Sequence, residues 1–183
     1  MNNISFKATN AGSTTILVRR QDGEFTTQPA YFAKMNRDSK MDYYSASDVA
    51  DLWVDVRPNY VKSIQNHASI IDEEKRDVYF FTTQEKNYRK IRPEQVIGMF
   101  EVTHNPNSDF INFIQSHPNA MHGAENRLYK NVGQEMVNKI DKLSNAPEIF
   151  LKTLKKLTQF YAKYGYRIVQ DGYPYVVMKL KRY

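Results

Sequence analysis

The sequence QVIGMFEVT at residues 95–103 is followed, after a polar turn, by DFINFIQS at residues 109–116. Both runs are rich in β-branched and aromatic side chains, and Asn and Pro stand between them, which is typical of two antiparallel strands. A third run of this kind, DVYFFTT, precedes them at residues 77–83. Because apolar side chains occupy consecutive positions, we expect these strands to be covered on both faces, at the centre of a sheet.

The segments on either side alternate between helical and extended patterns. Upstream, we predict a strand at 14–20, a helix from 45 to 56 after a capping box of Ser45 and Asp48, and a helix at 61–71. Downstream, we predict helices at 128–143 and 154–164, the second closed by Gly165, and strands at 148–153, 166–170 and 175–180, the last two joined by the turn Asp171-Gly172.

This order of elements predicts an α/β fold. We expect a mixed sheet of six to seven strands with helices on both faces, because each helix has one apolar stripe to bury. Residues 1–13 are rich in Asn, Ser and Thr, so we expect a loosely ordered tail there. Residues 14–183 are then expected to form a single domain.

Composition excludes several kinds of protein. The chain has 183 residues and no cysteine, which excludes zinc ribbons, thiol nucleophiles and disulfide scaffolds. No apolar run approaches the roughly 18 residues of a membrane span. The net charge is +6, and residues 151–183 contain eight Lys and Arg against one acid, Asp171. A basic surface attracts polyanions, so we expect this C-terminal part of the chain to bind an anionic substrate or the phosphates of a cofactor.

Three short segments carry a resemblance to a known family. They are INFIQSHP at 111–118, YKNVGQEMV at 129–137 and FYAKYGY at 160–166. They resemble, in order, the central strand, the pyrophosphate loop with its helix, and the last helix of the GNAT-type N-acetyltransferases. Over residues 95–183 the chain resembles this family, which implies a GNAT-like fold. It also implies acetyl-CoA as co-substrate and direct acyl transfer to an amine in a ternary complex.

The resemblance implies a cofactor site on two segments. The pantetheine arm would pair with the backbone of Ile114, Gln115 and Ser116. The pyrophosphate would lie near Lys130 on the amides of Asn131, Val132, Gly133 and Gln134. The physical basis is general, because the amides at a helix N-terminus are unpaired and the helix dipole is positive there.

This loop departs from the family pattern. The pattern Gln/Arg-x-x-Gly-x-Gly/Ala falls on Leu128, Asn131 and Gly133, so only the last glycine is kept. Gly133 has no Cβ to obstruct a phosphate, and asparagine tolerates a left-handed backbone better than most residues. An anion site therefore stays compatible with this sequence.

The resemblance also implies catalytic residues. Tyr161 would donate a proton to the departing CoA thiolate, although Leu154 replaces the asparagine that commonly precedes this tyrosine by seven positions. For the general base we expect Glu101 or Asp109, with His117 as a further candidate. The same side chains also fit purely structural roles, since aromatic residues at helical spacing commonly pack in a core and strand-end carboxylates are commonly solvated.

No metal site is expected from this sequence. The residues that suggest one are His104, His117, His122 and Glu125, and their spacing fits no recurring zinc pattern. The sequence also lacks a nucleophile elbow, a Walker loop and a dinucleotide fingerprint. Hydrolase, NTPase and dehydrogenase activities therefore have no local support.

Two alternatives come from other classes of protein. Thirteen tyrosines and ten phenylalanines interleaved with bases are also typical of a nucleic-acid-binding module, although no RRM, KH or helix-turn-helix signature is present. The other alternative is a GNAT-shaped binding protein without catalysis. The acceptor, whether a small molecule, a protein or an aminoacyl-tRNA, is not specified by the sequence. We expect a cytoplasmic location, and the acid-poor, Ser/Thr/Asn-rich start leaves export by a specialised secretion system as the alternative.

Overall fold

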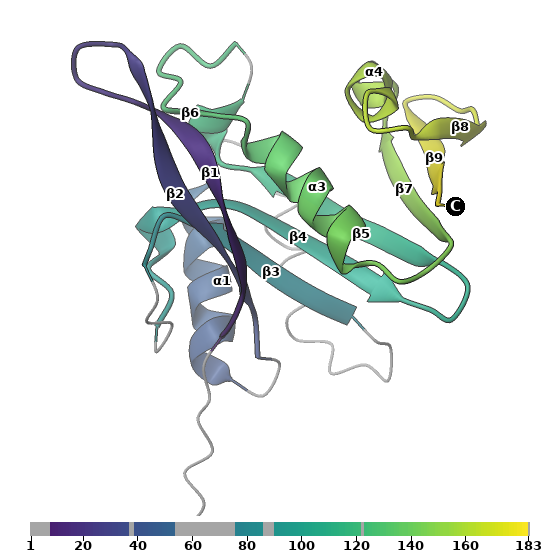
Figure 1. Cartoon of the computed structure of the whole chain (residues 1–183), viewed down its shortest axis with the longest axis horizontal. Coiled ribbons are helices and arrows are strands. Elements are labelled where there is room, and N and C mark those ends of the chain that lie inside the picture. The colour runs from purple at the N-terminus through teal and green to yellow at the C-terminus, as the bar shows by residue number, and fades with distance from the viewer. Residues whose placement is uncertain (1–7, 37–38, 54–75, 86–89, 122, 183) are drawn as a thin grey trace, which may run out of the picture.

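The computed structural model describes residues 8–36, 39–53, 76–85, 90–121 and 123–182, and its strands form one sheet (Figure 1). The strands are β1 (Thr9–Arg19), β2 (Phe25–Lys34), β3 (Arg76–Thr82), β4 (Val96–His104), β5 (Asp109–Ser116), β6 (Tyr129–Lys130), β7 (Glu148–Leu154), β8 (Arg167–Gln170) and β9 (Tyr175–Lys181). Their order is β6-β1-β2-β3-β4-β5-β7-β9-β8. All neighbours are antiparallel except β5 and β7, which are parallel. The predicted mixed sheet is confirmed.

The predicted number of strands, six to seven, was wrong, because the sheet has nine. The first unpredicted strand, β2, contains Pro29, which normally argues against a strand. Pro29 lies opposite Thr15 of β1, whereas β3 pairs only with residues 31–34 of β2. The proline therefore occupies a stretch with one partner strand, where its missing N–H is tolerated. The second, β6, has only two residues, too few for a pattern.

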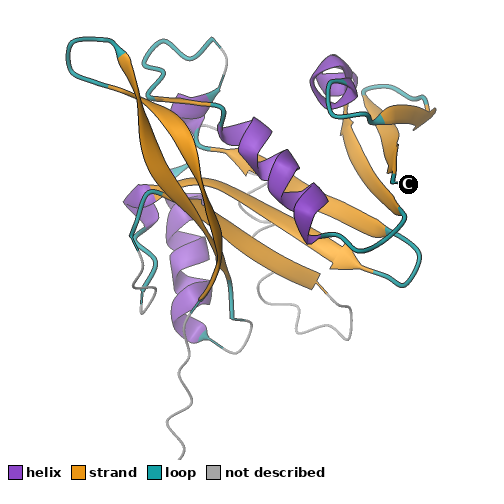
Figure 2. Cartoon of the chain, viewed as in Figure 1, coloured by secondary structure: helices purple, strands orange, loops and turns teal. Residues whose placement is uncertain are grey.

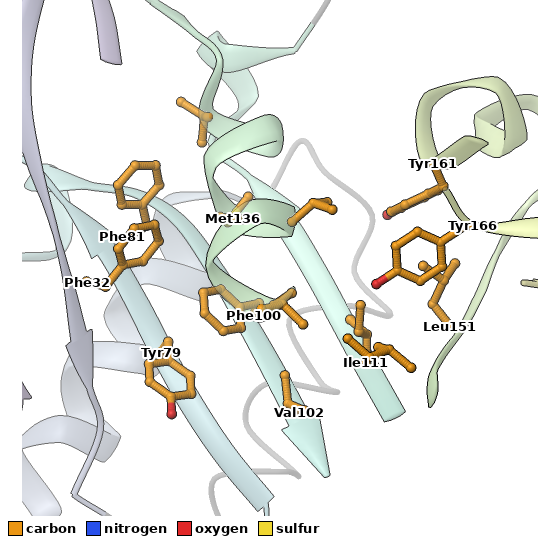
Figure 3. Close-up of a cluster of buried hydrophobic side chains, with 14 of the residues drawn as sticks. Phe32, Tyr79, Phe81, Phe100, Val102, Ile111, Met136, Leu151, Tyr161 and Tyr166 are labelled. Atoms are coloured by element: carbon orange, nitrogen blue, oxygen red, sulfur yellow. The ribbon is translucent and has the colours of Figure 1, made fainter. Parts of the chain in front are cut away.

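Helices cover both faces of the sheet, as predicted (Figure 2). The described helices are α1 (Lys40–Leu52), α3 (Val132–Leu143) and α4 (Thr158–Ala162). Under α3 lies an aromatic core that includes Phe32, Tyr79, Phe81 and Phe100 (Figure 3). On the other face α1 packs against a second core that includes Val49, Trp53, Phe80, Met99 and Phe113. The central strand β4 contributes side chains to both cores, as its sequence predicted.

A glycine in β4 lets α3 lie close to the sheet. A Cβ placed at Gly98 would stand 2.6 Å from Sδ of Met136 and 3.3 Å from Cγ1 of Val132, both on α3. A larger residue would force the side chain of Met136 out of its present position. This contact fixes the first two turns of α3 over β4, and it thereby fixes the position of the helix N-terminus.

The start of α1 differs from the prediction. The N-cap is Ser39, whose hydroxyl accepts a hydrogen bond of 3.1 Å from the amide of Asp42. The predicted capping box of Ser45 and Asp48 was wrong, because Ser45 lies inside the helix and its hydroxyl donates to the carbonyl of Ile91. Two Ser-x-x-Asp sequences follow each other here, and the local pattern alone does not distinguish them. The predicted helix at 61–71 lies outside the described residues.

The C-terminal elements largely follow the prediction. The helix predicted at 128–143 is present as α3 but begins only at Val132, because Tyr129 and Lys130 form β6. The helix predicted at 154–164 is shorter, because a 3-10 turn at Lys155–Leu157 precedes α4. Gly165 has a φ of +85°, which confirms the predicted glycine after the helix. Residues 171–174 connect β8 and β9, as the predicted bounds of these two strands required. None of the described helices is long and apolar enough to cross a membrane.

Candidate functional site

The sheet opens between its two parallel strands. Only Asp109–Ile111 of β5 pair with Ile149–Leu151 of β7. Beyond these residues β5 continues beside β4 alone, and β7 continues beside β9 (Figure 1). Within the described residues, no strand therefore pairs with the β7-facing edge of residues 112–116. This edge is a row of backbone amides and carbonyls that an extended ligand can pair with.

The N-terminus of α3 lies at the mouth of this opening. Its N-cap is Asn131, with a φ of 68° and no side-chain hydrogen bond to the helix. The left-handed backbone anticipated for Asn131 is thus present. The amide of Glu135 closes the first turn on the carbonyl of Asn131, but the amides of Val132, Gly133 and Gln134 precede that bond and have no partner within the helix. Such amides, at the positive end of the helix dipole, attract an anion.

Three segments meet at Gly133. A Cβ built there would lie 3.3 Å from Cζ of Phe160 on α4 and 3.6 Å from Oγ of Ser116 at the end of β5. The helix N-terminus, the open strand edge and α4 therefore converge at one residue. The structure brings together Ser116, Gly133 and the helix that contains Tyr161, as the resemblance implied.

Tyr161 faces the interior from α4. Its side chain is 5% exposed and packs edge-on against Phe160 and Tyr166, with ring centroids 5.0 and 6.0 Å away. In Figure 3 its hydroxyl points away from α4, towards the side on which β5 and α3 lie. The ring is thus part of the core, as its helical spacing indicated, while its hydroxyl lies on the side of the strand opening.

Glu101 is buried beside the point where the sheet opens. Asn112, the first residue of β5 beyond the pairing with β7, donates its Nδ2 hydrogens to Oε1 of Glu101 at 2.6 Å and to Oγ1 of Thr103 at 2.7 Å. Glu101 itself is 0% exposed. Since the side chain of Phe100 lies in the core under α3, alternation along β4 directs Glu101 to the opposite face.

Asp109 lies at the other end of β5 and is not brought to the opening. Its carboxylate is 3.1 Å from Nδ1 of His104, whose Nε2 lies 3.4 Å from Asp77. Asp77 also accepts a 2.6 Å hydrogen bond from Lys34. Five residues separate Asp109 from Ile114, which is about 17 Å along a strand. Asp109 therefore belongs to an ionic cluster at the closed end of the strand pair.

Histidines flank the two ends of β5 in opposite environments. The hydrogen bond with Asp77 raises the pKa of His104 against the effect of its partial burial. His117, just after β5, packs edge-on against Trp53 and Tyr129. Burial lowers the pKa of His117, and its Nδ1 accepts a hydrogen bond from the amide of Asn119. His117 is thus half-buried and held as a neutral ring.

Two residues near the helix N-terminus have settings that the sequence does not reveal. Lys130 points its ammonium at the ring of Phe25, 3.6 Å from the centroid, so the β1–β2 hairpin holds its charge. Phe160 has the helical spacing of a core residue, yet it lies against Gly133. The sequence does not distinguish a Phe160 packed in the core from a Phe160 that contacts Gly133, because both positions lie on the same face of the helix.

Comparisons with known proteins identify the fold. No protein-family model and no curated protein matches the sequence. Among solved structures, the chain is similar to the Campylobacter jejuni N-acetyltransferase PseH in complex with acetyl coenzyme A, at 14% identity and a TM-score of 0.51 over 75% of this chain and 90% of that one. It is also similar to the PaiA N-acetyltransferase of Thermoplasma acidophilum in complex with coenzyme A, at 15% identity and a TM-score of 0.52 over 83% and 98%.

A third similar structure is an acyl-CoA N-acyltransferase from Pseudomonas aeruginosa, at 12% identity and a TM-score of 0.55, covering 82% of this chain and 99% of that one. These similarities extend over most of the chain, and therefore include part of the region upstream of residue 95, where the sequence carried no resemblance of its own. The chain therefore has the fold of the GNAT acetyltransferases, with the open strand pair and the free helix N-terminus described above.

Proposed function

We propose that the protein is an acyl-CoA-dependent N-acyltransferase, with acetyl-CoA as the first donor to test. The observation that carries the proposal is the convergence of the open edge of β5 and the uncapped N-terminus of α3 at Gly133. An extended arm with amide groups fits the strand edge, and a pyrophosphate fits the helix amides. Coenzyme A contains both an amide-bearing pantetheine arm and a pyrophosphate. One continuous site along the strand edge and the helix N-terminus could therefore bind both groups of the same molecule.

The cofactor residues follow from this arrangement. The pantetheine arm pairs with the backbone of Ile114, Gln115 and Ser116, and the pyrophosphate binds the amides from Asn131 to Gln134. Lys130 contributes to the positive potential from its position over Phe25. Phe160 covers the junction at Gly133, so its ring has to give way or form the wall of the channel when the cofactor binds.

The reaction is a direct transfer. The neutral amine attacks the thioester carbonyl carbon, a C–N bond forms, the C–S bond breaks, and the thiolate takes a proton from the hydroxyl of Tyr161. Glu101, on the opposite face of the sheet from α3, takes the proton from the amine nitrogen, directly or through one water. We prefer Glu101 to Asp109 because Glu101 lies beside the opening, whereas Asp109 lies at the closed end of β5, about 17 Å along the strand from Ile114.

The test is binding of acetyl-CoA by thermal shift and calorimetry. A ligand at a hundredfold excess over its Kd stabilises a folded protein by about 2.7 kcal/mol, which for a chain of this size raises Tm by about 5 °C or more. Gly133→Ala adds only a Cβ against Phe160, while Gly133→Glu adds bulk and a negative charge at the helix amides. We expect a weaker shift for the first variant and none for the second.

Asn145→Glu is the matched control, because it adds the same charge at an exposed position beyond the other end of α3. It should keep the full shift. Absence of any shift in the parent protein at millimolar acetyl-CoA would contradict acetyl-CoA binding. A shift without transfer to any amine would instead favour the non-catalytic binding protein.

A further inference from the structure

One face of the C-terminal strands carries side chains that the proposed reaction does not use. Ile149 and Leu151 of β7, with Val176 and Met178 of β9, point into the core under α3 and α4. Because side chains alternate along a strand, the residues between them point to the opposite side. We call this side the outer face; it includes Phe110, Glu148, Phe150, Lys152, Arg167, Tyr175, Val177, Lys179 and Lys181.

The outer face is cationic. Lys179 lies opposite Phe150 on β7 and opposite Arg167 on β8, so these side chains share one side of the sheet. Lys152 and Lys181 lie on the same side by register, and Lys152, Arg167 and Lys181 are exposed. Among the described residues of these strands, Glu148 is the acid on this side, and it is bonded to Lys179 at 3.0 Å. Four bases therefore meet one acid.

Aromatic rings are interleaved with these bases. Phe110 and Phe150 stack with centroids 5.2 Å apart and planes 16° from parallel, across β5 and β7. Lys152 holds its ammonium 5.2 Å from the ring centroid of Tyr175. Phe110 is 42% exposed and Tyr175 is 40% exposed. Large apolar rings left this open on a charged sheet face offer flat surfaces for stacking.

The described helices leave this face open. The helices near these strands, α3 and α4, pack on the inner side, and α1 lies at the other end of the sheet (Figure 1). A second copy of this chain is a poor partner, because a two-fold contact would bring the same four bases against each other. Coenzyme A is also a poor partner, because its proposed phosphate site is on the α3 side. The positive charge of the outer face therefore favours a polyanion other than coenzyme A as its partner.

We propose that the outer face binds single-stranded nucleic acid. Strands that present aromatic rings to unstacked bases, here β5, β7 and β9, with Lys and Arg around them for phosphates, form a known physical mode of single-strand recognition. An acidic peptide would satisfy the bases but would leave Phe110 and Tyr175 without flat partners. Glu101 lies on the same side of the sheet, at the strand opening, so a strand bound here would run past the side from which an amine approaches.

The test is fluorescence anisotropy of labelled twelve-nucleotide oligo(dT) and oligo(rU) with the full chain at low salt. Lys152→Glu with Arg167→Glu removes two bases that hold phosphates, and we expect at least a tenfold loss of affinity. Removing each of these bases should also reduce the slope of log K against log salt by about 0.7. Phe110→Ala and Tyr175→Ala should each weaken binding at least fivefold with the salt slope unchanged, since stacking is worth about 1–3 kcal/mol per base.

Lys156→Glu with Lys163→Glu is the charge-matched control, because both lysines are exposed near α4 on the inner side. It should weaken binding less than threefold. Equal losses in the control and in the outer-face variants would overturn the proposal, and so would aromatic variants that bind like the parent. Poly-glutamate or duplex DNA that binds as tightly as the single strands would also overturn it. Acetyl-CoA binding is measured separately, so its failure does not bear on these results.

Discussion

The two ends of β5 are built in opposite ways. At the Asp109 end the strand has partners on both sides, and its charged side chains are held by His104 and the cluster beyond it. At the Ser116 end the strand is paired only with β4, and the nearest helix terminus offers amides without a side-chain cap. Charged side chains thus mark the closed, structural end, while the candidate site is made largely of backbone groups.

The largest expected effect concerns the open end. Tyr161→Phe removes the hydroxyl proposed as proton donor and keeps the ring in its core position. We expect kcat to fall by about a hundredfold or more, with acetyl-CoA binding unchanged, since general acid catalysis contributes about 10²- to 10⁴-fold. Tyr166→Phe is the control, because it removes a neighbouring buried hydroxyl and should leave kcat within a few-fold. A Tyr161→Phe enzyme of normal kcat would remove Tyr161 from the reaction.

The second prediction sets the two candidate bases against each other. Glu101→Gln should lower kcat by about a hundredfold with little change in Tm. Asp109→Asn should instead lower Tm, because it weakens the ion pair with His104, and should change kcat less than tenfold. Steady-state kinetics and thermal melts of both variants decide the comparison. A large loss of kcat in Asp109→Asn, with normal kcat in Glu101→Gln, would instead place the general base at the closed end of β5. The amine would then have to bind at that end of the strand.

A smaller effect is expected from the residue that holds Glu101. Asn112→Ala removes the amide that donates to Glu101 and to Thr103. A hydrogen bond to a buried charged group contributes about 1.5–3 kcal/mol, so chemical denaturation should show a loss of about that size or somewhat less, because Asn112 is exposed. Unchanged stability in Asn112→Ala would mean that Glu101 is held by other groups.

The smallest expected effect is a difference in titration between His104 and His117. The pKa of His104 is raised by Asp77, so its contribution to stability is complete below about pH 6.5 and is lost as the pH rises through the folded-state pKa. The pKa of His117 is lowered by burial, so stability is lost as the pH falls below about 6.5, where the unfolded chain takes up the proton.

Proton NMR of the two imidazoles should place the midpoint of His104 above that of His117. The variants His104→Gln and His117→Gln assign the NMR signals. In His104→Gln the free energy of unfolding should no longer fall as the pH rises through the pKa of His104, and in His117→Gln it should no longer fall as the pH drops below about 6.5. Midpoints in the reverse order would show that the ionic cluster at the closed end is not formed in solution.

Sequence reasoning was most successful where a pattern depends on neighbouring residues. The apolar runs predicted β4 and β5, the helical spacing predicted α3, and Gly165 marked the end of α4, because each depends on local backbone preferences and periodicity. It was least successful where two identical local signals compete. Ser39 and Ser45 each precede an aspartate by three residues, but the helix begins at Ser39, while Ser45 lies inside it and donates to the carbonyl of Ile91.

The sequence by itself determined the class of fold, the absence of cysteine chemistry, and the segments at 111–118, 129–137 and 160–166 that pointed to an acyl-CoA site. The tertiary structure alone decided which ends of those segments meet. Strand pairing stops at Ile111 and Leu151, Gly133 comes to Ser116, and Asp109 goes to the far end. The physical reason is that strand register and helix packing are long-range choices, set by how whole elements bury their apolar faces, and no short window of sequence encodes them.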